Sequence, residues 1–216
     1  MKFSSECRLC PRLSTFLDEV KVGHPTYFAK PVPSFGDATA SFLIVGLAPG
    51  MHGANRTGRP FTGDYAGDLL YSTLYKFGFS SSAEPLAVDG NANTQLALLN
   101  CKITNAVRCL PPQNKPEPAE IKMCNGYLAT ELAVLPAGAA VLALGTIAHQ
   151  AVLRASGLRA KDYAFAHGAK HVLPGGLHFF DSYHCSRYNT QTKRLTTPMF
   201  HDIFKSIKEY LGSTRL

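Results

Sequence analysis

The sequence has no long apolar run: across 216 residues, no stretch approaches the roughly 20 apolar residues that a membrane-spanning helix requires. It also lacks a charged-then-apolar leader at its start, the pattern of a secretory signal. These absences exclude a transmembrane segment and a membrane partner. They favour a cytoplasmic protein whose thiols stay reduced.

Internal repeats and linkers are absent as well, so nothing in the sequence divides the chain into several domains. We expect one domain spanning residues 1–216. A chain of this length buries enough surface to fold without disulfides.

Acidic residues are in deficit, with 15 Asp and Glu against 22 Lys and Arg, a formal charge of +7 and a sequence pI near 9.1. This balance suits a polyanionic partner such as nucleic acid. Many basic proteins bind nothing anionic, however. The net charge is therefore consistent with nucleic-acid binding, but the evidence for that binding must come from other features of the sequence.

Six cysteines are present, and four of them are arranged as C-x2-C and C-x14-C: Cys7, Cys10, Cys109 and Cys124. Two thiolate pairs converging on one point can supply four sulfur ligands to an iron–sulfur cluster or to a structural zinc ion, and spacing alone does not separate the two. The other two, Cys101 and Cys185, lie in apolar or strand-like contexts and are expected to be small buried side chains.

Apolar runs alternate with helical patterns along the chain. Strands are expected over residues 42–45, 102–107, 139–144 and 178–183, and helices over 66–79, from Pro118 onward, 146–155 with Thr146 as its cap, and 198–211. Residues 80–94 and 154–170 are expected to be surface connections. This alternation predicts a three-layer α/β/α sandwich around a mostly parallel sheet.

Two loops that follow predicted strands are rich in hydrogen-bonding groups. The loop of residues 46–64, GLAPGMHGANRTGRPFTGD, has the glycines that let a backbone approach a ligand, but it lacks the lysine of a phosphate-binding loop and can equally be a structural turn. The loop of residues 183–196 places His184 at a strand end, followed by phosphate-type donors such as Ser186. A lone histidine is as often structural as functional.

Taken together, four motifs resemble the family 5 (B-type) uracil-DNA glycosylases of bacteria and archaea. They are the four cysteines, the 46–64 loop, ITNAVRC at 103–109 and SYHCSRYNTQTKRLT at 182–196. The resemblance implies the uracil-DNA glycosylase fold, a structural [4Fe–4S] cluster on those cysteines, and DNA containing uracil as partner. It further implies a monomeric, nucleoid-associated repair enzyme that flips uracil out, hydrolyses its N-glycosidic bond and leaves an abasic site.

The resemblance also implies roles for individual residues. Phe61 would stack on the flipped base, Asn105 would read the uracil edge, and His184 would hydrogen-bond the O2 oxygen as negative charge grows there. Without the resemblance, Phe61 reads as ordinary core and Asn105 as a strand-end cap. Backbone groups of the loop that follows the first predicted strand would also contact the base. The residues predicted to do so are Gly46, Ala48 and Gly50.

Leu47 and Ala48 depart from the wider superfamily, which places an acid or asparagine there to position the attacking water. Asp64 and Asn55 are the alternative catalytic candidates, although each can serve the loop's own hydrogen bonds. The missing acid implies a roomier pocket that accepts other deaminated bases such as hypoxanthine.

Basic and polar side chains around these loops could bind the phosphates that flank the extruded nucleotide. The DNA-binding prediction comprises Arg56, Ser186, Arg187 and Asn189, with Arg59, Lys193 and Arg194 as further candidates that are by default solvated surface. Cys185 replaces a proline found in many relatives.

Two alternatives stay open from the sequence. One is an A-type (family 4) uracil-DNA glycosylase, which the absence of a glutamate at Leu47 disfavours. The other is a non-catalytic iron–sulfur protein that kept the fold and binds DNA or senses redox state.

Overall fold

A six-stranded sheet forms the centre of the computed structural model, which describes residues 1–213. The strand order is β1-β3-β2-β4-β6-β5, with β3, β2, β4 and β6 parallel and the two edge strands antiparallel. The strands are β1 (Phe35–Gly36), β2 (Phe42–Gly46), β3 (Cys101–Asn105), β4 (Ala140–Leu144), β5 (Lys170–Val172) and β6 (His178–Ser182).

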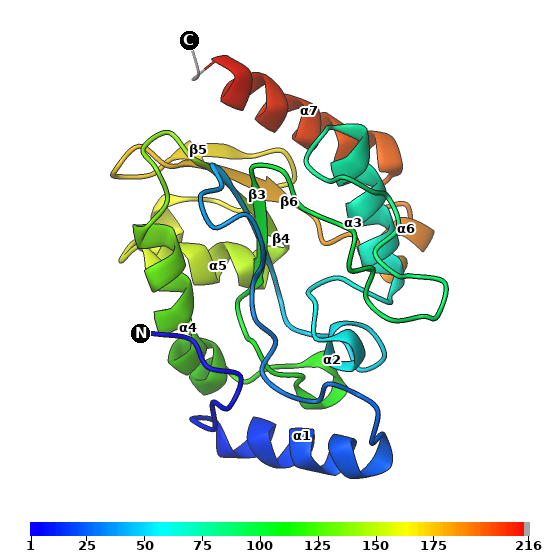
Figure 1. Ribbon diagram of the computed structural model, residues 1–216. Helices are drawn as coiled ribbons and strands as arrows, with labels where there is room; N and C mark the ends of the chain where they lie inside the picture. The colour runs from blue at the N-terminus through cyan, green and yellow to red at the C-terminus, as the bar shows by residue number, and fades with distance from the viewer. Residues whose placement is uncertain (214–216) are drawn as a thin grey trace.

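Helices cover both faces of this sheet (Figure 1). α3 (Tyr65–Lys76) and α7 (Thr197–Ser213) pack together on one face, and α4 (Pro118–Ala133) and α5 (Thr146–Ala155) pack together on the other. Every residue of β2 and β4 is buried, as expected of strands covered on both faces. The predicted α/β fold with a mostly parallel sheet is confirmed.

Several elements differ from the sequence expectation. The strand expected over 102–107 is Cys101–Asn105, and just beyond it the amides of Ala106 and Val107 still donate to the carbonyls of Gly46 and Leu47. Thr146 is the first helical residue of α5 rather than its cap. Gly145 occupies the cap position with a φ of +97°, a conformation that favours glycine.

The edge strands β1 and β5, the helix α1 (Pro11–Gly23) and the short helices α2 (Ala54–Thr57) and α6 (Arg187–Gln191) were not predicted. The short helices lie inside the two polar loops, and 3-10 turns occupy Pro112–Asn114 and Ala160–Asp162. α1 lies at the end of the molecule opposite α7 (Figure 1). It buries Leu13, Leu17 and Val20, which recur at helical spacing.

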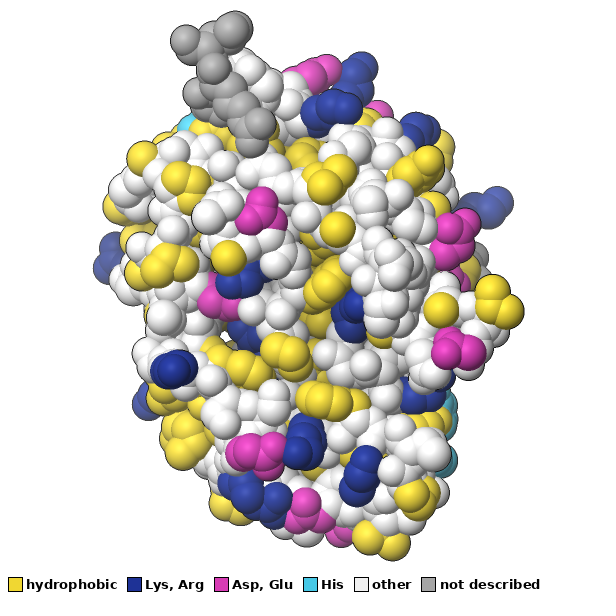
Figure 2. All heavy atoms as spheres, viewed as in Figure 1, with side chains coloured by type: hydrophobic (Ala, Val, Ile, Leu, Met, Phe, Trp, Pro, Cys, Tyr) yellow, Lys and Arg dark blue, Asp and Glu magenta, His cyan; other side chains and the backbone are white. Residues whose placement is uncertain are grey.

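Charge is dispersed on the face of the molecule drawn in Figure 2, where lysine and arginine side chains occur at many places and several lie beside an acid. Within residues 1–213, no helix combines the length and apolar character needed to cross a membrane.

Candidate active site and cysteine centre

A cavity of about 620 Å³ opens where the loops after β2 and β6 meet. Parallel strands end together at this edge, so loops far apart in sequence become neighbours. The lining residues are Leu47, Ala48, Gly50, Ala54, Phe61, Asp64, Tyr65, Ala66, Asn114, His184, Ser186 and Arg187. The structure thus joins both predicted loops in one pocket.

Gly46 is the point on which two predicted base-binding side chains pack. A Cβ atom at this position would lie 2.4 Å from Asn105 Oδ1 and 2.6 Å from the Phe61 ring, so only glycine fits. Phe61 itself has a φ of +54°, a strained conformation for a phenylalanine that the surrounding packing holds. Gly67 supports it, because a Cβ there would lie 1.8 Å from the Phe61 carbonyl oxygen.

His184 faces Phe61 across this pocket, with ring centroids 5.9 Å apart and an interplanar angle of 26°. Its backbone is fixed by Asn189, whose Nδ2 donates to the His184 carbonyl at 2.8 Å, and Ser186 caps the α6 helix that follows. Desolvation by burial lowers the pKa of His184 to about 4. The imidazole is therefore neutral near pH 7 and able to donate one hydrogen bond.

Asp64 caps helix α3, accepting a hydrogen bond from the Gly67 amide at 2.9 Å, and it also lines the pocket. Its second carboxylate oxygen, Oδ2, lies against Gly50 and Gly53. Burial raises the pKa of this carboxyl group. Asp64 thus has a structural hydrogen bond on one oxygen and the glycine-rich loop at the other.

Two buried carboxamides beside the pocket have unmet hydrogen-bonding capacity. Neither Asn55 Oδ1 nor Asn55 Nδ2 has a protein partner, although the residue is fully buried, and Asn105 Oδ1 is likewise unpartnered. Neither residue is among the lining residues of the cavity, but Asn105 Oδ1 lies at Gly46 beside the Phe61 ring, which does line it. Buried amides without partners are rare in folded proteins and point to water or ligand.

The predicted phosphate-binding arginines divide into two groups. Arg56 donates to the carbonyls of His52 and Gly90, and Arg59 donates to that of Asn93 and lies over the Phe35 ring. Both are partly buried and tie down the 80–94 connection.

Arg187 is exposed at the pocket rim, its guanidinium over the Tyr65 ring. Lys193 and Arg194 are also exposed and lie outside the lining. Sequence reasoning missed Tyr65 and Asn114 as lining residues. Only their positions in the sequence could have indicated them: Tyr65 comes directly after Asp64, and Asn114 lies in the proline-rich loop that follows Cys109.

The four predicted cysteines line a second, apolar cavity on the α1 side of the molecule. Cys10 precedes α1, Cys124 lies on α4, and Cys7 and Cys109 come from the adjoining loops. Two donors already point at the sulfurs: the Arg108 amide donates to Cys124 Sγ and the Tyr127 hydroxyl to Cys7 Sγ, both at 3.3 Å. Cys101 and Cys185 lie elsewhere and are buried, as expected.

The size of this sulfur set bears on what it can hold. A tetrahedral zinc ion with bonds of about 2.3 Å draws its four sulfurs to about 3.8 Å from one another. In the described part of the chain, no three cysteine sulfurs lie within 4.8 Å of one another. The four sulfurs are therefore not gathered as closely as the ligands of one tetrahedral zinc ion.

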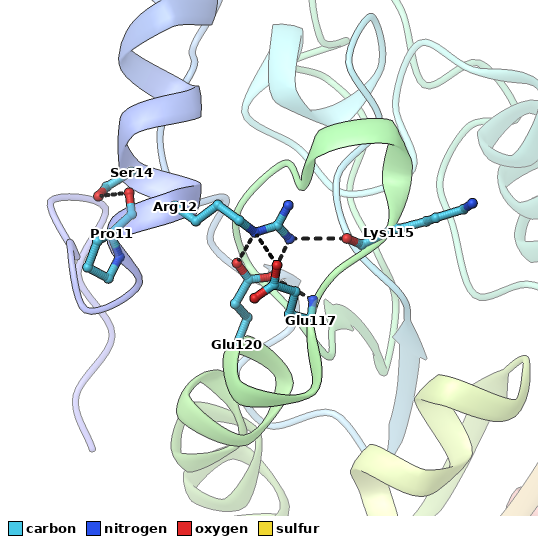
Figure 3. A network of polar contacts seen from close by, with 6 residues as sticks. All are labelled: Pro11, Arg12, Ser14, Lys115, Glu117 and Glu120. Atoms are coloured by element: carbon cyan, nitrogen blue, oxygen red, sulfur yellow. Dashed lines mark hydrogen bonds and ion pairs between the residues drawn. The ribbon is translucent and has the colours of Figure 1, made fainter.

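An arginine holds the two halves of the cysteine centre together (Figure 3). Arg12 on α1 makes two 2.8 Å hydrogen bonds to the buried carboxylate of Glu120 on α4, lies 3.2 Å from Glu117, and donates to the Lys115 carbonyl. Paired bonds of this kind are geometrically specific. They fix the helix that follows Cys10 against the helix that carries Cys124.

Comparison with known proteins agrees with this geometry. The family model described as "Uracil DNA glycosylase superfamily" matches residues 33–208. That match, on a mostly parallel sheet with a loop-built pocket at its strand ends, defines a hydrolase of the uracil-DNA glycosylase class. A type-5 uracil-DNA glycosylase of Thermus thermophilus is 48% identical over 212 residues, covering 95% of this chain and 94% of the relative. The chain belongs to the type-5 uracil-DNA glycosylase family.

Other relatives agree with this assignment. A type-5 uracil-DNA glycosylase of Mycobacterium bovis is 41% identical over 216 residues, which are 96% of this chain and 79% of the relative. A type-4 enzyme of Pyrobaculum aerophilum is 32% identical over only 136 residues, which are 62% of this chain and 59% of the relative. The family indicated by the sequence motifs is confirmed.

Proposed function

We propose that the protein removes uracil from DNA by hydrolysing the N-glycosidic bond, leaving an abasic site. The observation that carries this proposal is the pocket in which Phe61 and His184 face each other, with the Asn105 amide buried behind them. A base inside a duplex hides the bond to be broken, so the nucleotide must first swing out into such a pocket.

Phe61 supplies the stacking surface for the extruded base, held rigid by Gly46 and Gly67. Asn105 supplies an amide that donates to O4 and accepts from N3–H of uracil; cytosine presents the reversed pattern. The unpartnered Asn105 Oδ1 is the acceptor in this arrangement. Backbone groups between Gly46 and Gly50, Ala48 among them, complete the base-binding surface.

His184 donates a hydrogen bond to uracil O2, where negative charge grows as the base departs. A neutral imidazole suits this role, because its N–H group is already in place to donate before the reaction begins and takes up no proton from solvent. The attacking water is held by Asn55 and Asp64: the first has a buried amide without partners, and the second a carboxylate oxygen against the glycine loop. Cleavage is largely dissociative, so little base assistance is needed.

The rim residues Ser186, Arg187 and Asn189 position the DNA backbone, with Arg187 as the exposed cation closest to the pocket. Arg56 contributes by holding the 80–94 connection, which leaves part of its guanidinium for a phosphate. The apolar lining at Leu47 and Ala48 supports a broader substrate range that includes hypoxanthine.

Cys7, Cys10, Cys109 and Cys124 would hold a [4Fe–4S] cluster. The four-thiol donor set, the apolar wall and the two donors aimed at sulfur fit such a group, and the sulfur spacing fits it better than zinc. When bound, the cluster stabilises the folded segments around it and takes no part in hydrolysis. We further propose that the protein acts as a monomeric single domain over residues 1–216, of which 214–216 lie outside the described residues, on the DNA of a bacterial or archaeal nucleoid.

A release assay tests the function. The full-length protein is incubated with a labelled oligonucleotide carrying one uracil, then treated with alkali, and scission at the uracil position is expected. A matched oligonucleotide with thymine at that position should stay intact. DNA retardation in a gel without scission would instead support the non-catalytic binding protein and overturn the proposal. A hypoxanthine oligonucleotide tests the wider substrate range separately.

Gly46→Ala is expected to lower uracil release by at least tenfold, because the added methyl group must displace the Phe61 ring or the Asn105 amide. The measurement is single-turnover cleavage at saturating enzyme. Gly23→Ala is the matched control, since a methyl group added there would meet no atom within 4 Å. Equal rates for the two variants would show that Phe61 and Asn105 have no positional role.

The lowered pKa of His184 predicts a stability change with pH. The unfolded chain binds a proton at this imidazole below pH 6.5 and the folded chain only below about pH 4, so folding stability falls as pH drops between these values. At pH 5 the loss relative to pH 7.5 is about 2 kcal/mol. Urea unfolding of wild type and His184→Gln at both pH values isolates this contribution. Identical pH dependence in both proteins would contradict the burial of a neutral imidazole.

A further inference from the structure

Three metal-ligating side chains meet on the sheet face opposite α7, away from both sites described above. His149 lies on α5, His171 on the edge strand β5, and Asp181 on β6. Their ligand atoms all lie within 4.8 Å of one another. His149 and Asp181 are buried and His171 is partly exposed.

The contacts within this cluster are incomplete. His149 Nδ1 lies 2.8 Å from Asp181 Oδ1, but the other carboxylate oxygen, Asp181 Oδ2, has no hydrogen-bond partner. His171 Nε2 lies 3.6 Å from this oxygen and is also buried without a hydrogen bond. Leaving a carboxylate oxygen of a fully buried aspartate unpaired is costly, and such atoms need an explanation.

The surroundings of His149 narrow the explanation. Its Nε2 lies 3.0 Å from the backbone carbonyl of Tyr163, which only accepts hydrogen bonds, so Nε2 carries the proton. In the neutral ring, Nδ1 then presents a lone pair to a carboxylate, which repels it. Three arrangements remove this repulsion: a buried imidazolium, a protonated Asp181 carboxyl group that donates to Nδ1, or a cation among Nδ1, Asp181 and His171.

A metal ion would contact all three side chains at once, whereas an imidazolium or a protonated carboxyl group leaves the 3.6 Å contact between Asp181 Oδ2 and His171 Nε2 longer than a hydrogen bond. Metal-bound histidines characteristically donate their other N–H to a backbone carbonyl, as His149 does to Tyr163. Ligands at 2.0–2.2 Å from a tetrahedral ion lie about 3.3 Å apart. Here His149 Nδ1 lies 2.8 Å from Asp181 Oδ1 and His171 Nε2 lies 3.6 Å from Asp181 Oδ2, and one ligand atom from each of the three residues lies within 4.8 Å of the others.

We propose that His149, His171 and Asp181 form a binding site for one divalent transition-metal ion, with zinc as the ion their chemistry suits. Two imidazoles and one carboxylate are a ligand set for zinc, and a water entering past His171, whose side chain is 19% exposed, completes four-coordination. Phe165 and Phe179 wall the site. The ion links β5 and α5 to β6, the strand that leads to His184.

Zinc binding to the full-length protein with its iron intact tests this site. Calorimetric titration with ZnCl2 should give one equivalent bound to wild type, and the melting temperature should rise with zinc because the ion binds only the folded state. His171→Asn should weaken zinc binding by at least tenfold and abolish the zinc-dependent rise in melting temperature. Uracil release without added zinc should stay as in wild type.

His178→Asn is the matched control, because His178 lies on β6, the strand that carries Asp181, but stacks on Tyr210 of α7 on the other face of the sheet. It should bind zinc as wild type does. Iron content is measured on every sample, so that zinc entering emptied cysteine sites is recognised. Equal zinc affinity in wild type and His171→Asn, or no zinc effect on the melting temperature of wild type, would overturn the metal site and leave a buried, hydrogen-bonded His149–Asp181 pair.

Discussion

His184→Ala is expected to lower the rate of uracil release by a hundredfold or more, while iron content and folding stay intact. Removing one well-placed donor to a developing anion costs roughly 3–4 kcal/mol of transition-state stabilisation. The imidazole lies in the pocket opposite Phe61, and its lowered pKa keeps it a neutral donor across the range in which the assay is run. Single-turnover alkaline-scission rates measure the effect.

Two further variants make this result specific. His24→Ala removes a histidine that stacks on Tyr27 and lies outside the pocket lining, and this variant should release uracil at the wild-type rate. His184→Gln retains an N–H donor of similar reach and should recover part of the lost rate. Near-normal turnover in His184→Ala would show that another group stabilises the departing base.

Cys109→Ala is expected to lose the visible absorbance of the proposed [4Fe–4S] cluster together with most of the folded protein. Metal binding and folding are coupled at such centres, and Cys109 lies in the apolar wall between α1 and α4. Iron analysis and circular dichroism of the purified variant measure the two losses. Wild type should contain about four iron atoms per chain, the content of one [4Fe–4S] cluster.

Cys101→Ala provides the matched control for this experiment. Cys101 is also a fully buried thiol, but it lies in the sheet core and outside the cysteine cavity. Its loss should cost about 1 kcal/mol of stability and leave the iron content unchanged. A Cys109→Ala protein that is colourless, stable and fully active would show that the four cysteines hold no structural cluster.

The parts of the fold that sequence patterns predicted are those with strong local signals. β2 and β4 are continuous buried apolar runs, and α7 has its buried residues at helical spacing. β1 and β5 have only two and three residues and are largely exposed, so no periodicity could reveal them. Their pairing is decided by the neighbouring strands.

The sites show the same division. Motif order was enough to place Phe61 and His184 in one pocket, because both follow strands that end at the same edge. Hydrogen bonds from Arg56 to Gly90 and from Arg59 to Asn93 could not be read from sequence, since they depend on how the 80–94 connection folds back. The cluster of His149, His171 and Asp181 had no spacing signal either, because sheet pairing and the α5 crossover bring it together.

The Arg12–Glu120 ion pair makes the amino-terminal segment, up to the end of α1, part of the structure that holds α4 in place. Cleavage after α1 would remove two of the four sulfurs and the Arg12 guanidinium together, leaving the buried Glu120 carboxylate without its cation. Proteolysis that removes this segment should therefore destabilise α4 in the middle of the chain.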